Sequence, residues 1–524
     1  MISRRTIART AAFLPACLAL PGGADAQSLA REQRIDFGLG YGDLGTLDPH
    51  ITTSSADIPA LPHIFDGLLL LQDALTSPMP RPGLAERWES AGGGKVWTFF
   101  LRQGVRWHGD FGEFSSADAK FSIERVMDQR LGSPFRQSYA NVERVDADGP
   151  AVMRVTLREA DPDFPRLLVN YQVGYVVCKR AIESGVDPAR RPIGTGPFQF
   201  AGYRPRENLT LVRNETYWGG RPGIERIVLH FMPEGATREL ALRGGDVIAI
   251  DIEARQDIVE RLRRRGDIVD VTQSGSPYWL QINLTKKPFD DVRVRRALAH
   301  ATNRDELIAF SGTDLTTPEY SAVPAGYDGA IEQVERYPHD VERARALLAE
   351  AGHAGGFTTE AVVSNSVLYL PYMNIMREQW RKAGITVNMR VVDHPTFHRL
   401  LRQDASPLII YAARRYPSTA TIYLEQFYAA DAAIGKPTAI TNFAHYGEAI
   451  EGIDALLARS REAGSADARN ALLAEAQRKI AQDVPVIPLF SKKTPIARSR
   501  RLDPGYPLGD IPYYVFDGRT RVLA

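Results

Sequence analysis

Two adjacent arginines at the end of an apolar run are the residues whose type and spacing suggest chemistry most directly. Arg414 and Arg415 follow the strand-like stretch 408–411 and precede Tyr416-Pro417. A guanidinium group keeps its charge and can hold a carboxylate or phosphate through two parallel hydrogen bonds. Because side chains alternate along a strand, the two arginines should point to opposite sides. One arginine of the pair is therefore suited to binding an anion, and the other should face away from it.

No motif for catalysis accompanies these arginines. The sequence has no glycine-rich loop of the P-loop pattern, no HExxH and no GxSxG nucleophile elbow. Acidic pairs such as Asp290-Asp291 lie in predicted loops, where solvated turn residues are the ordinary interpretation. Nothing in these motifs points to catalysis, and a hydrolase that uses an acid pair outside them stays an alternative.

Histidines and cysteines predict neither a metal site nor a cofactor. His394 and His398 are four residues apart, but they bracket Pro395 at a predicted strand exit, which argues against two metal ligands on one helical face. Cys17 and Cys178 are the only cysteines. Cys178 lies in the apolar run YVVCKRAI, so we expect a packed thiol there and no disulfide framework.

Length and composition are those of an ordinary globular protein. The 524 residues are 44% hydrophobic and 24% charged, which allows two or three packed lobes. The formal net charge is +1, and about −1 without residues 1–26. This balance argues against a nucleic acid or a charged membrane surface as partner. Beyond the N-terminus, no apolar run reaches the roughly 18 to 20 residues that span a bilayer.

Residues 1–26 have the pattern of an export signal. Arg4-Arg5 form a twin arginine, residues 10–21 are apolar, and Ala24-Asp25-Ala26 resembles a small-residue cleavage site. We expect cleavage after Ala26 and a periplasmic protein that begins at Gln27.

Two alternatives for the N-terminus stay open. The LPAC sequence at Cys17 resembles a lipoprotein site, although Pro15 is unusual there. Ile7 stands where a twin-arginine signal has Phe or Leu, so the twin-arginine and general export routes both remain.

Alternating strand and helix patterns in the rest of the chain predict an α/β protein. Gly194 and Gly196 are expected to allow a tight turn. Strands are expected over 34–40, 96–102, 209–214, 224–232, 278–284 and 386–393. Helices are expected over 58–72, 115–127, 236–246, 292–310, 373–384 and 466–482.

Five stretches together resemble a known family, and they occur in that family's order. They are LAERWESAGGGKVWTFFLRQGVRWHGDFGEFSSADAKFSIERVMD, RPIGTGPFQF, LVRNETYWGGRPGIERIVLHF, KKPFDDVRVRRALAHATNRDELI and DVERARALLAEAGH. The chain is similar over nearly its whole mature length to the extracellular solute-binding proteins of the peptide and nickel class, family 5. These proteins, which include dipeptide- and oligopeptide-binding proteins, serve ABC importers.

The resemblance implies a two-lobed type II periplasmic-binding-protein fold whose hinge is crossed twice, near 274–278 and 487–491. Lobe I would comprise 27–275 and 490–524, with an extra subdomain over about 50–190, and lobe II would comprise 276–489. It also implies a monomer without cofactor that delivers a small solute to an ABC permease of the inner membrane. The same fold used for sensing or chaperoning is the alternative.

The resemblance also gives the arginines a position in the site. In peptide binders of this family, a strand of lobe II ends in a Trp-x-x-Asp-Tyr-Pro-like motif whose Asp meets the ligand's ammonium group. In this chain Ala412 replaces the Trp and Arg415 replaces the Asp. The departure favours a solute with an anionic group, such as an acidic or N-blocked peptide, an opine-like conjugate or a sugar phosphate. Alternatively, both arginines lie on the surface and pair with Asp404 or Glu425.

The family's layout implies further ligand-binding residues with less specificity. A polar loop of lobe I offers hydroxyl groups, and strand ends of lobe II offer an amide and an imidazole. Tyr411 would supply an aromatic wall in place of the missing Trp. The remaining residues of this expected set are Thr53, Ser54, Ser55, Asn365 and His394, together with Arg414 beside Arg415.

Overall fold

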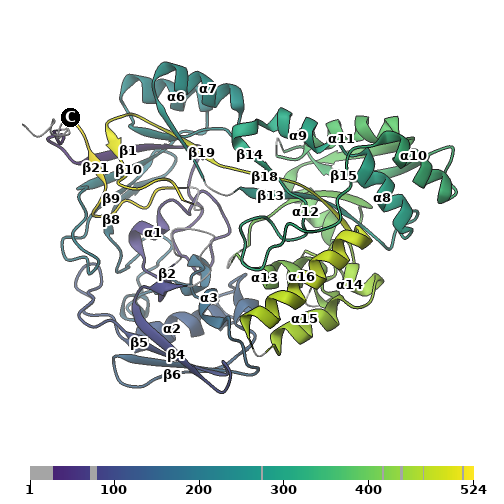
Figure 1. The fold of residues 1–524 in the computed structure, drawn as a ribbon. Helices are drawn as coiled ribbons and strands as arrows, with labels where there is room; N and C mark the ends of the chain where they lie inside the picture. Colours follow the sequence, from purple (N-terminus) through teal and green to yellow (C-terminus); the bar gives the residue numbers. More distant parts are fainter. Residues whose placement is uncertain are drawn as a thin grey trace, which may run out of the picture.

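Two lobes of mixed α/β structure lie side by side and are joined near the middle of the molecule (Figure 1). The computed structural model describes residues 28–524 except 71–79, 273–274, 367, 416–417, 437–438, 440, 464 and 510–512. The expected two-lobed α/β fold is therefore confirmed. The predicted export signal and Cys17 lie outside the described residues. No helix in the described part of the chain is long and apolar enough to cross a membrane.

Lobe I is built on a seven-stranded sheet whose centre is β1 (Arg34–Leu39), which lies between parallel neighbours. The strands are, in spatial order, β12 (Ile268–Val271), β19 (Pro495–Arg498), β11 (Ala249–Asp251), β1, β10 (Arg226–Phe231), β9 (Asn208–Arg213) and β8 (Phe198–Arg204). Helices α6 (Gly235–Gly244) and α7 (Gln256–Arg265) lie together at the upper edge of this lobe in Figure 1. The strands predicted over 34–40, 209–214 and 224–232 are confirmed.

A subdomain of lobe I has its own four-stranded sheet and core. Trp97, Phe99 and Leu101 are buried on one face of its second strand, as the alternating pattern predicted. Ser115 caps the long helix, and Asp118 completes the capping box. The sheet is β4 (Ala85–Ala91), β5 (Val96–Leu101), β7 (Val152–Leu157) and β6 (Val142–Ala147). Around it lie α2 (Ser116–Met127), η1 (Arg136–Tyr139), α3 (Phe164–Leu167), α4 (Tyr171–Gly174), α5 (Lys179–Glu183), β2 (Leu69–Leu70) and β3 (Arg81–Pro82).

The helix predicted over 58–72 was wrong. Among the described residues of this range, only α1 (Leu61–Ile64) is helical, because tertiary hydrogen bonds hold the next residues extended. The buried carboxylate of Asp66 accepts hydrogen bonds from Thr195 Oγ1 at 2.8 Å and from Trp218 Nε1 at 2.7 Å. A Cβ on Gly194 would lie 1.9 Å from the carbonyl oxygen of Ile64. This glycine therefore serves a close approach of two backbones rather than the tight turn predicted for it.

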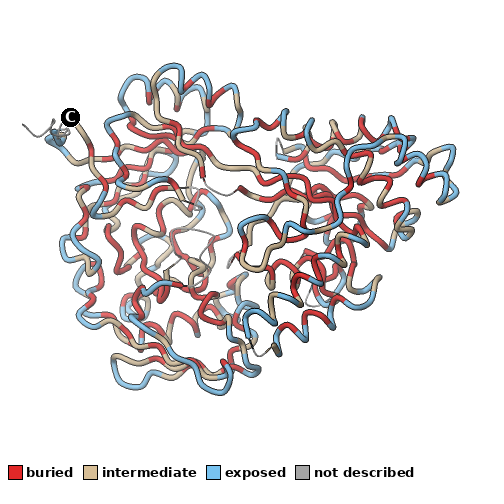
Figure 2. Tube along the Cα trace, in the orientation of Figure 1, coloured by how far each residue is buried: buried red, intermediate tan, exposed pale blue. Residues whose placement is uncertain are grey.

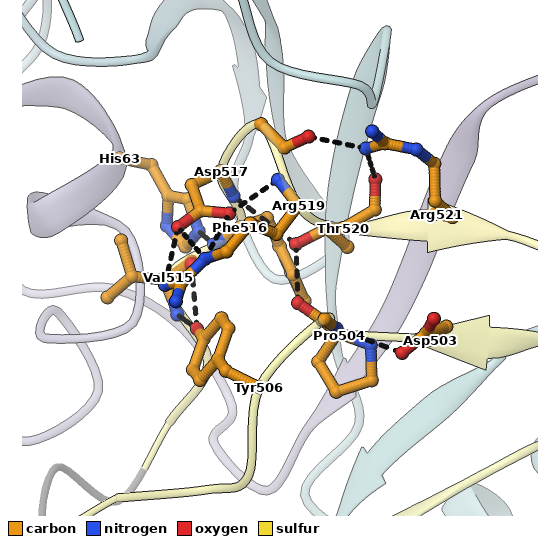
Figure 3. A network of polar contacts seen from close by, with 12 residues as sticks. His63, Asp503, Pro504, Tyr506, Val515, Phe516, Asp517, Arg519, Thr520 and Arg521 are labelled. Atoms are coloured by element: carbon orange, nitrogen blue, oxygen red, sulfur yellow. Dashed lines mark hydrogen bonds and ion pairs between the residues drawn. The ribbon is translucent and has the colours of Figure 1, made fainter. Parts of the chain in front are cut away.

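The C-terminal segment returns to lobe I and is fixed there by a polar network (Figure 3). The Phe516 N–H donates to His63 Nε2 at 3.0 Å, and His63 Nδ1 lies 2.9 Å from the carbonyl oxygen of Pro59. The ring is thus a neutral imidazole that accepts at one nitrogen and donates at the other. Thr520 Oγ1 donates to the carbonyl oxygen of Pro504 at 3.1 Å. Within this segment, strands β20 (Leu502–Asp503) and β21 (Arg521–Val522) pair antiparallel with each other.

Lobe II combines a four-stranded antiparallel sheet with a parallel strand pair. Figure 2 shows its buried residues concentrated on the strands and on the inner sides of the helices. The four-stranded sheet is β14 (Thr316–Pro318), β18 (Val486–Lys492), β13 (Ser276–Ile282) and β17 (Leu408–Ala412), and the pair is β15 (Phe357–Ser364) with β16 (Ile385–Val392). The helices are α8 (Val292–Ala301), α9 (Arg304–Ser311), α10 (Val341–Glu350), α11 (Leu370–Lys382), α12 (His394–Arg402), α13 (Ala420–Tyr428), α14 (Tyr446–Ala449), α15 (Ile453–Arg461) and α16 (Ala466–Asp483), with η2 (Thr313–Leu315) and η3 (Ala430–Ala432).

One predicted helix of lobe II is two helices in the structure. The pattern over 292–310 breaks at Thr302 and Asn303, where α8 ends and α9 begins. The side chain of Asn303 accepts a hydrogen bond from the Glu306 N–H and so caps the second helix. The strand over 278–284 and the helices over 373–384 and 466–482 appear where they were predicted, with small shifts at their ends.

The chain passes between the two large sheets twice, and the two passages are hydrogen-bonded to each other. The Thr272 N–H donates to the carbonyl oxygen of Thr494, and the Thr494 N–H donates to Thr272 Oγ1, both at 3.0 Å. A Cβ on Gly275 would lie 2.5 Å from the backbone nitrogen of Lys492. The chain thus passes from one sheet to the other between β12 and β13, and again between β18 and β19.

Away from this double connection, four charged residues join the lobes. Asp163 and Arg166 belong to the subdomain, and Asp328 and Arg469 belong to lobe II. Each arginine contacts both carboxylates: Arg166 lies 3.2 Å from Asp163 and 2.5 Å from Asp328, and Arg469 lies 2.7 Å from Asp163 and 3.7 Å from Asp328. All four side chains are less than a quarter exposed. We call these four residues the interlobe ion network.

Removing one carboxylate from the interlobe ion network should favour separation of the lobes. Asp328→Asn leaves the two arginines with Asp163 as their one carboxylate in the network and removes the ion pair between Arg166 and lobe II, a loss of about 2 kcal/mol in the free energy of closure. Small-angle scattering at low ionic strength should show a larger radius of gyration than for the parent protein. Glu425→Gln, which breaks an ion pair inside lobe II, is the matched control. Equal radii for parent and Asp328→Asn protein would contradict a role of the network in closure.

A second prediction concerns His63 and pH. Burial lowers the pKa of His63 to about 4 from an ordinary value of 6.5. Between these two values the unfolded chain binds a proton that the folded chain refuses, so this residue makes stability fall as pH falls from 6.5 to 4. The slope for one proton is about 1.4 kcal/mol per pH unit.

Comparison with a non-titrating variant isolates this contribution, because every other titrating group cancels. The free energy of unfolding of the parent, minus that of His63→Gln, should decrease between pH 7 and pH 5 in urea titrations. A difference that is the same at both pH values would show that His63 is protonated in the folded protein as readily as in the unfolded chain.

Candidate functional site

The lobe I candidates Thr53, Ser54 and Ser55 lie in a loop that two buried carboxylates hold in place. Asp57 accepts hydrogen bonds from the Gly45 N–H at 2.7 Å and from Thr52 Oγ1 at 2.6 Å. Thr53 and Ser55 are exposed, and Ser54 is half-buried. The loop therefore presents hydroxyl groups on a backbone whose conformation is already fixed.

The start of the same loop is held by a buried ion pair. Arg125 from α2 donates to Asp48 through both terminal nitrogens, at 3.0 and 2.6 Å, and the two side chains are only 11% and 3% exposed. Arg125 also donates to His50 Nδ1 at 3.0 Å, while His50 Nε2 faces the carbonyl oxygen of Tyr175. Burial lowers the pKa of His50 to about 4, so its ring is neutral at neutral pH.

In lobe II, His394 and Tyr411 lie in one cluster that His398 connects. His394 Nε2 lies 3.2 Å from His398 Nε2, and the His398 ring meets Tyr411 edge-on with centroids 6.0 Å apart. Phe443 also packs on Tyr411, with ring centroids 5.2 Å apart. Burial, together with His394 and Arg402, lowers the pKa of His398 to about 4. The rings of His394, His398, Tyr411 and Phe443 thus form one cluster beside the end of β17, which we call the aromatic and imidazole wall.

The expectation that Pro395 keeps His394 and His398 off one helical face was wrong. Asp393 caps α12 by accepting the Thr396 N–H at 2.9 Å, and His394 is the first residue of the helix. A proline in the first turn is tolerated because its missing N–H would have no partner within the helix. The two histidines therefore occupy positions i and i+4 of the same helix.

Arg415 is a half-buried cation whose partners are neutral. Its Nε donates to Gln426 Oε1, its other nitrogens donate to the Arg414 carbonyl oxygen at 3.2 Å and to Thr441 Oγ1 at 3.1 Å. The guanidinium carbon lies 4.7 Å from the centre of the Phe427 ring. No carboxylate of the described residues pairs with Arg415.

The surface alternative for Arg415 required a pair with Asp404 or Glu425. In the structure Asp404 pairs with Lys286 at 2.8 Å and with His445 at 3.0 Å. Glu425 pairs with Arg461 at 2.9 Å. No ion pair between described residues joins Arg415 to either carboxylate, so the pairing expected by that alternative is not seen for Arg415. Tyr416 and Pro417, which define the motif, lie outside the described residues.

The remaining candidates are only partly brought together. Asn365 is exposed directly after β15, where its N–H donates to the carbonyl oxygen of Val392 at 2.8 Å. Arg414 is half-buried beside Arg415. No hydrogen bond or ion pair between described residues links Thr53, Ser54 or Ser55 to the lobe II candidates.

The described part of the chain shows neither a cluster of metal ligands nor a cavity large enough to enclose a cofactor. No group of three or more His, Cys, Asp or Glu residues there is placed to hold a metal ion. A hollow lined by Arg304, Tyr320 and Arg336 inside lobe II holds about 20 Å³, which is room for little more than a water molecule.

Sequence reasoning missed His398 and the interlobe ion network. Pro395 favours a strand exit at this point, whereas Asp393, three residues before Thr396, is a helix start signal. No local sequence pattern indicates the interlobe ion network, because Arg166 and Asp328 are 162 positions apart and Asp163 and Arg469 are 306 positions apart.

Comparison with known proteins adds three findings. Heme-binding protein A of Haemophilus influenzae is 28% identical over 339 residues, which cover 59% of this chain and 61% of that protein. The dipeptide-binding protein of Escherichia coli is 29% identical over 339 residues, 58% of this chain and 62% of that protein. Both matches thus span less than two thirds of the relative's length. The solved structure of MoaA from A. tumefacien R10 in complex with mannopinic acid is 31% identical, with a TM-score of 0.81 over 94% of this chain and 100% of that one.

The sequence model of the bacterial extracellular solute-binding proteins, family 5 middle, matches residues 79–433. This match covers more than half of the chain, and MoaA extends the likeness to nearly all of it. The chain belongs to the bacterial extracellular solute-binding proteins of family 5.

Proposed function

We propose that this protein is the periplasmic substrate-binding component of an ABC importer and that its solute is a small organic molecule with an anionic group. The single observation that carries the proposal is the half-buried guanidinium of Arg415 with its neutral partners. The solute would be released to a permease of the inner membrane without chemical change. The relatives described above are binding proteins by name.

The geometry around Arg415 suits an anion because the cation is held in place and its charge is not neutralised. Three of its five N–H groups donate to Gln426, Thr441 and the Arg414 carbonyl oxygen, which leaves two for a ligand. Phe427 supports the guanidinium plane, a contact that fixes its orientation. A partly desolvated cation is stabilised more by an anionic ligand than by a neutral one, so a carboxylate or phosphate is the favoured ligand group.

MoaA supports the choice of solute class. That protein was solved with mannopinic acid, and it is similar to this chain over almost the full length of both. An opine-like conjugate or another acidic solute is therefore favoured over a plain dipeptide, whose ammonium group Arg415 would repel. The exposed hydroxyl groups of Thr53 and Ser55 and the aromatic wall at Tyr411 would contact the rest of the solute.

Binding of the anion should depend on Arg415. Loss of a charge-assisted pair inside a closed cleft costs on the order of 2 to 5 kcal/mol, so Arg415→Ala should weaken binding about 30-fold or more. Thermal-shift assays with mannopinic acid, glutathione and Met-Leu should give the largest rise in melting temperature with an acidic solute. Affinity is then measured by calorimetry on parent, Arg415→Lys and Arg415→Ala proteins.

Arg459→Ala, at an exposed arginine on α15, is the matched control and should bind as the parent does. Arg415→Lys keeps the charge without the fork and should lie between parent and Arg415→Ala, which separates a ligand contact from a folding defect. Met-Leu as the best of the three solutes, or full affinity in Arg415→Ala, would contradict an anion-binding role of Arg415.

Export is a separate prediction from residues 1–26. Protein recovered from the periplasm should begin at Gln27, because Ala24-Asp25-Ala26 suits signal cleavage. Replacing Arg4 and Arg5 together with Lys should stop export if the twin-arginine route is used, whereas Arg9→Lys should not. N-terminal sequencing and cell fractionation give both answers, and a lipidated Cys17 as first residue would contradict the cleavage site.

A further inference from the structure

We propose that Asp251 of lobe I is a solute-binding residue and that its carboxylate takes a protonated amine of the solute. This role, which rests on the proposed function, adds to the anion at Arg415 a second charged group of opposite sign. The two groups are held by different lobes, so a solute that carries both would connect the lobes when they close.

Asp251 is the last residue of β11, at the edge of the lobe I sheet that lies next to lobe II. Strands β10 and β11 both run parallel to β1, so the carboxyl ends of the three strands meet at one edge. Strand β19 runs antiparallel to β11 and pairs Ile496 with Asp251, two residues after the passage at 493–494 from lobe II. Ligands of open α/β sheets bind outside the carboxyl ends of the strands.

The carboxylate of Asp251 is half-buried and has no cationic partner among the described residues. Its Oδ2 accepts the Gly40 N–H at 3.2 Å, and its other oxygen has no hydrogen-bond partner in the described chain. The neighbouring guanidinium of Arg238 is used by backbone carbonyl groups instead. Its Nε donates to the carbonyl oxygen of Asp251 at 2.8 Å. One of its terminal nitrogens donates to the carbonyl oxygens of Met232 and Pro233.

The surroundings of this carboxylate favour a cationic ligand over a neutral one. Burial raises the pKa of Asp251 to about 6, although the Gly40 N–H and the charge of Arg238 both lower it. The charged and titratable groups that face it are Arg238 on α6 and the Tyr41 hydroxyl after β1, while β19 places the apolar Ile496 opposite it. A partly desolvated carboxylate that is ionised at neutral pH is stabilised most by a charge-assisted hydrogen bond.

Tyr41 lies close both to Asp251 and to the polar loop of lobe I. Burial raises the pKa of the Tyr41 hydroxyl, a hydrogen bond to Ser55 opposes this shift, and the negative charge of Asp251 adds to it. Lobe I thus brings one of its expected hydroxyl groups and one carboxylate to the same region. A solute amine at Asp251 would lie within reach of both.

The experiment compares solutes that differ only in their amine. Mannopinic acid and glutathione, each as the free amine and as its N-acetyl derivative, are titrated into the mature chain at pH 7.5 in a calorimeter. At least one free amine should bind about tenfold or more tightly than its acetylated form. Asp251→Asn keeps an acceptor for the Gly40 N–H and should remove this preference. Asp246→Asn, at an exposed carboxylate before the amino end of β11, is the matched control and should keep it.

Two further measurements separate a ligand contact from a structural role. The affinity of the parent for the free amine, relative to that of Asp251→Asn, should fall about tenfold from pH 7 to pH 5, because Asp251 then takes up a proton. Without solute, Asp251→Asn should melt at the temperature of the parent or above it at pH 7.5, because the substitution removes a partly buried charge that has no counter-charge.

Equal affinities for free and acetylated amines, or full affinity in Asp251→Asn, would overturn the role of Asp251. Tight binding of the acetylated acids would at the same time leave the anion site at Arg415 standing. A lower melting temperature of unliganded Asp251→Asn would assign the carboxylate a structural role. Absence of binding by both free amines also overturns the proposal, and the acetylated acids then decide separately about Arg415.

Discussion

The two chain connections between the lobes are hydrogen-bonded to each other through Thr272 and Thr494. This pairing limits how the lobes can move, and so limits which other contacts between the lobes can form. The close packing of Gly275 on the backbone of Lys492 leaves no room for a side chain at this point. The lobes can therefore approach or separate chiefly by rotation about the two passages. The interlobe ion network lies away from this axis, where a small rotation changes interatomic distances most.

Local sequence signals predicted the elements well where short-range physics decides. Alternation gave the buried face of Trp97, Phe99 and Leu101, and the capping box gave the start of α2. The helix predicted over 58–72 was wrong because Asp66 is held by distant partners such as Trp218. Hydrophobic run length cannot reveal a buried carboxylate that needs hydrogen bonds from 150 residues away.

The part of the candidate site that could be predicted from the sequence is the part formed by strand β17 and the residues directly after it. The end of β17 and the aromatic helix α13 placed Arg415 next to Phe427, and the residue types fixed the chemistry. The aromatic and imidazole wall depended instead on whether a helix could begin at His394. The start signal at Asp393 is local, but Pro395 next to it gives an opposing local signal, because proline ordinarily disfavours a helix interior.

The burial of Cys178 has a practical consequence. Its thiol is packed in the subdomain core, and burial raises its pKa to about 11, so little nucleophilic thiolate exists at neutral pH. Cys17 lies within the predicted signal, and the sequence contains no other cysteine. A cysteine introduced at an exposed position of either lobe would therefore react selectively with a fluorophore or spin label. An optical reporter of solute binding could therefore be attached without first replacing the buried Cys178.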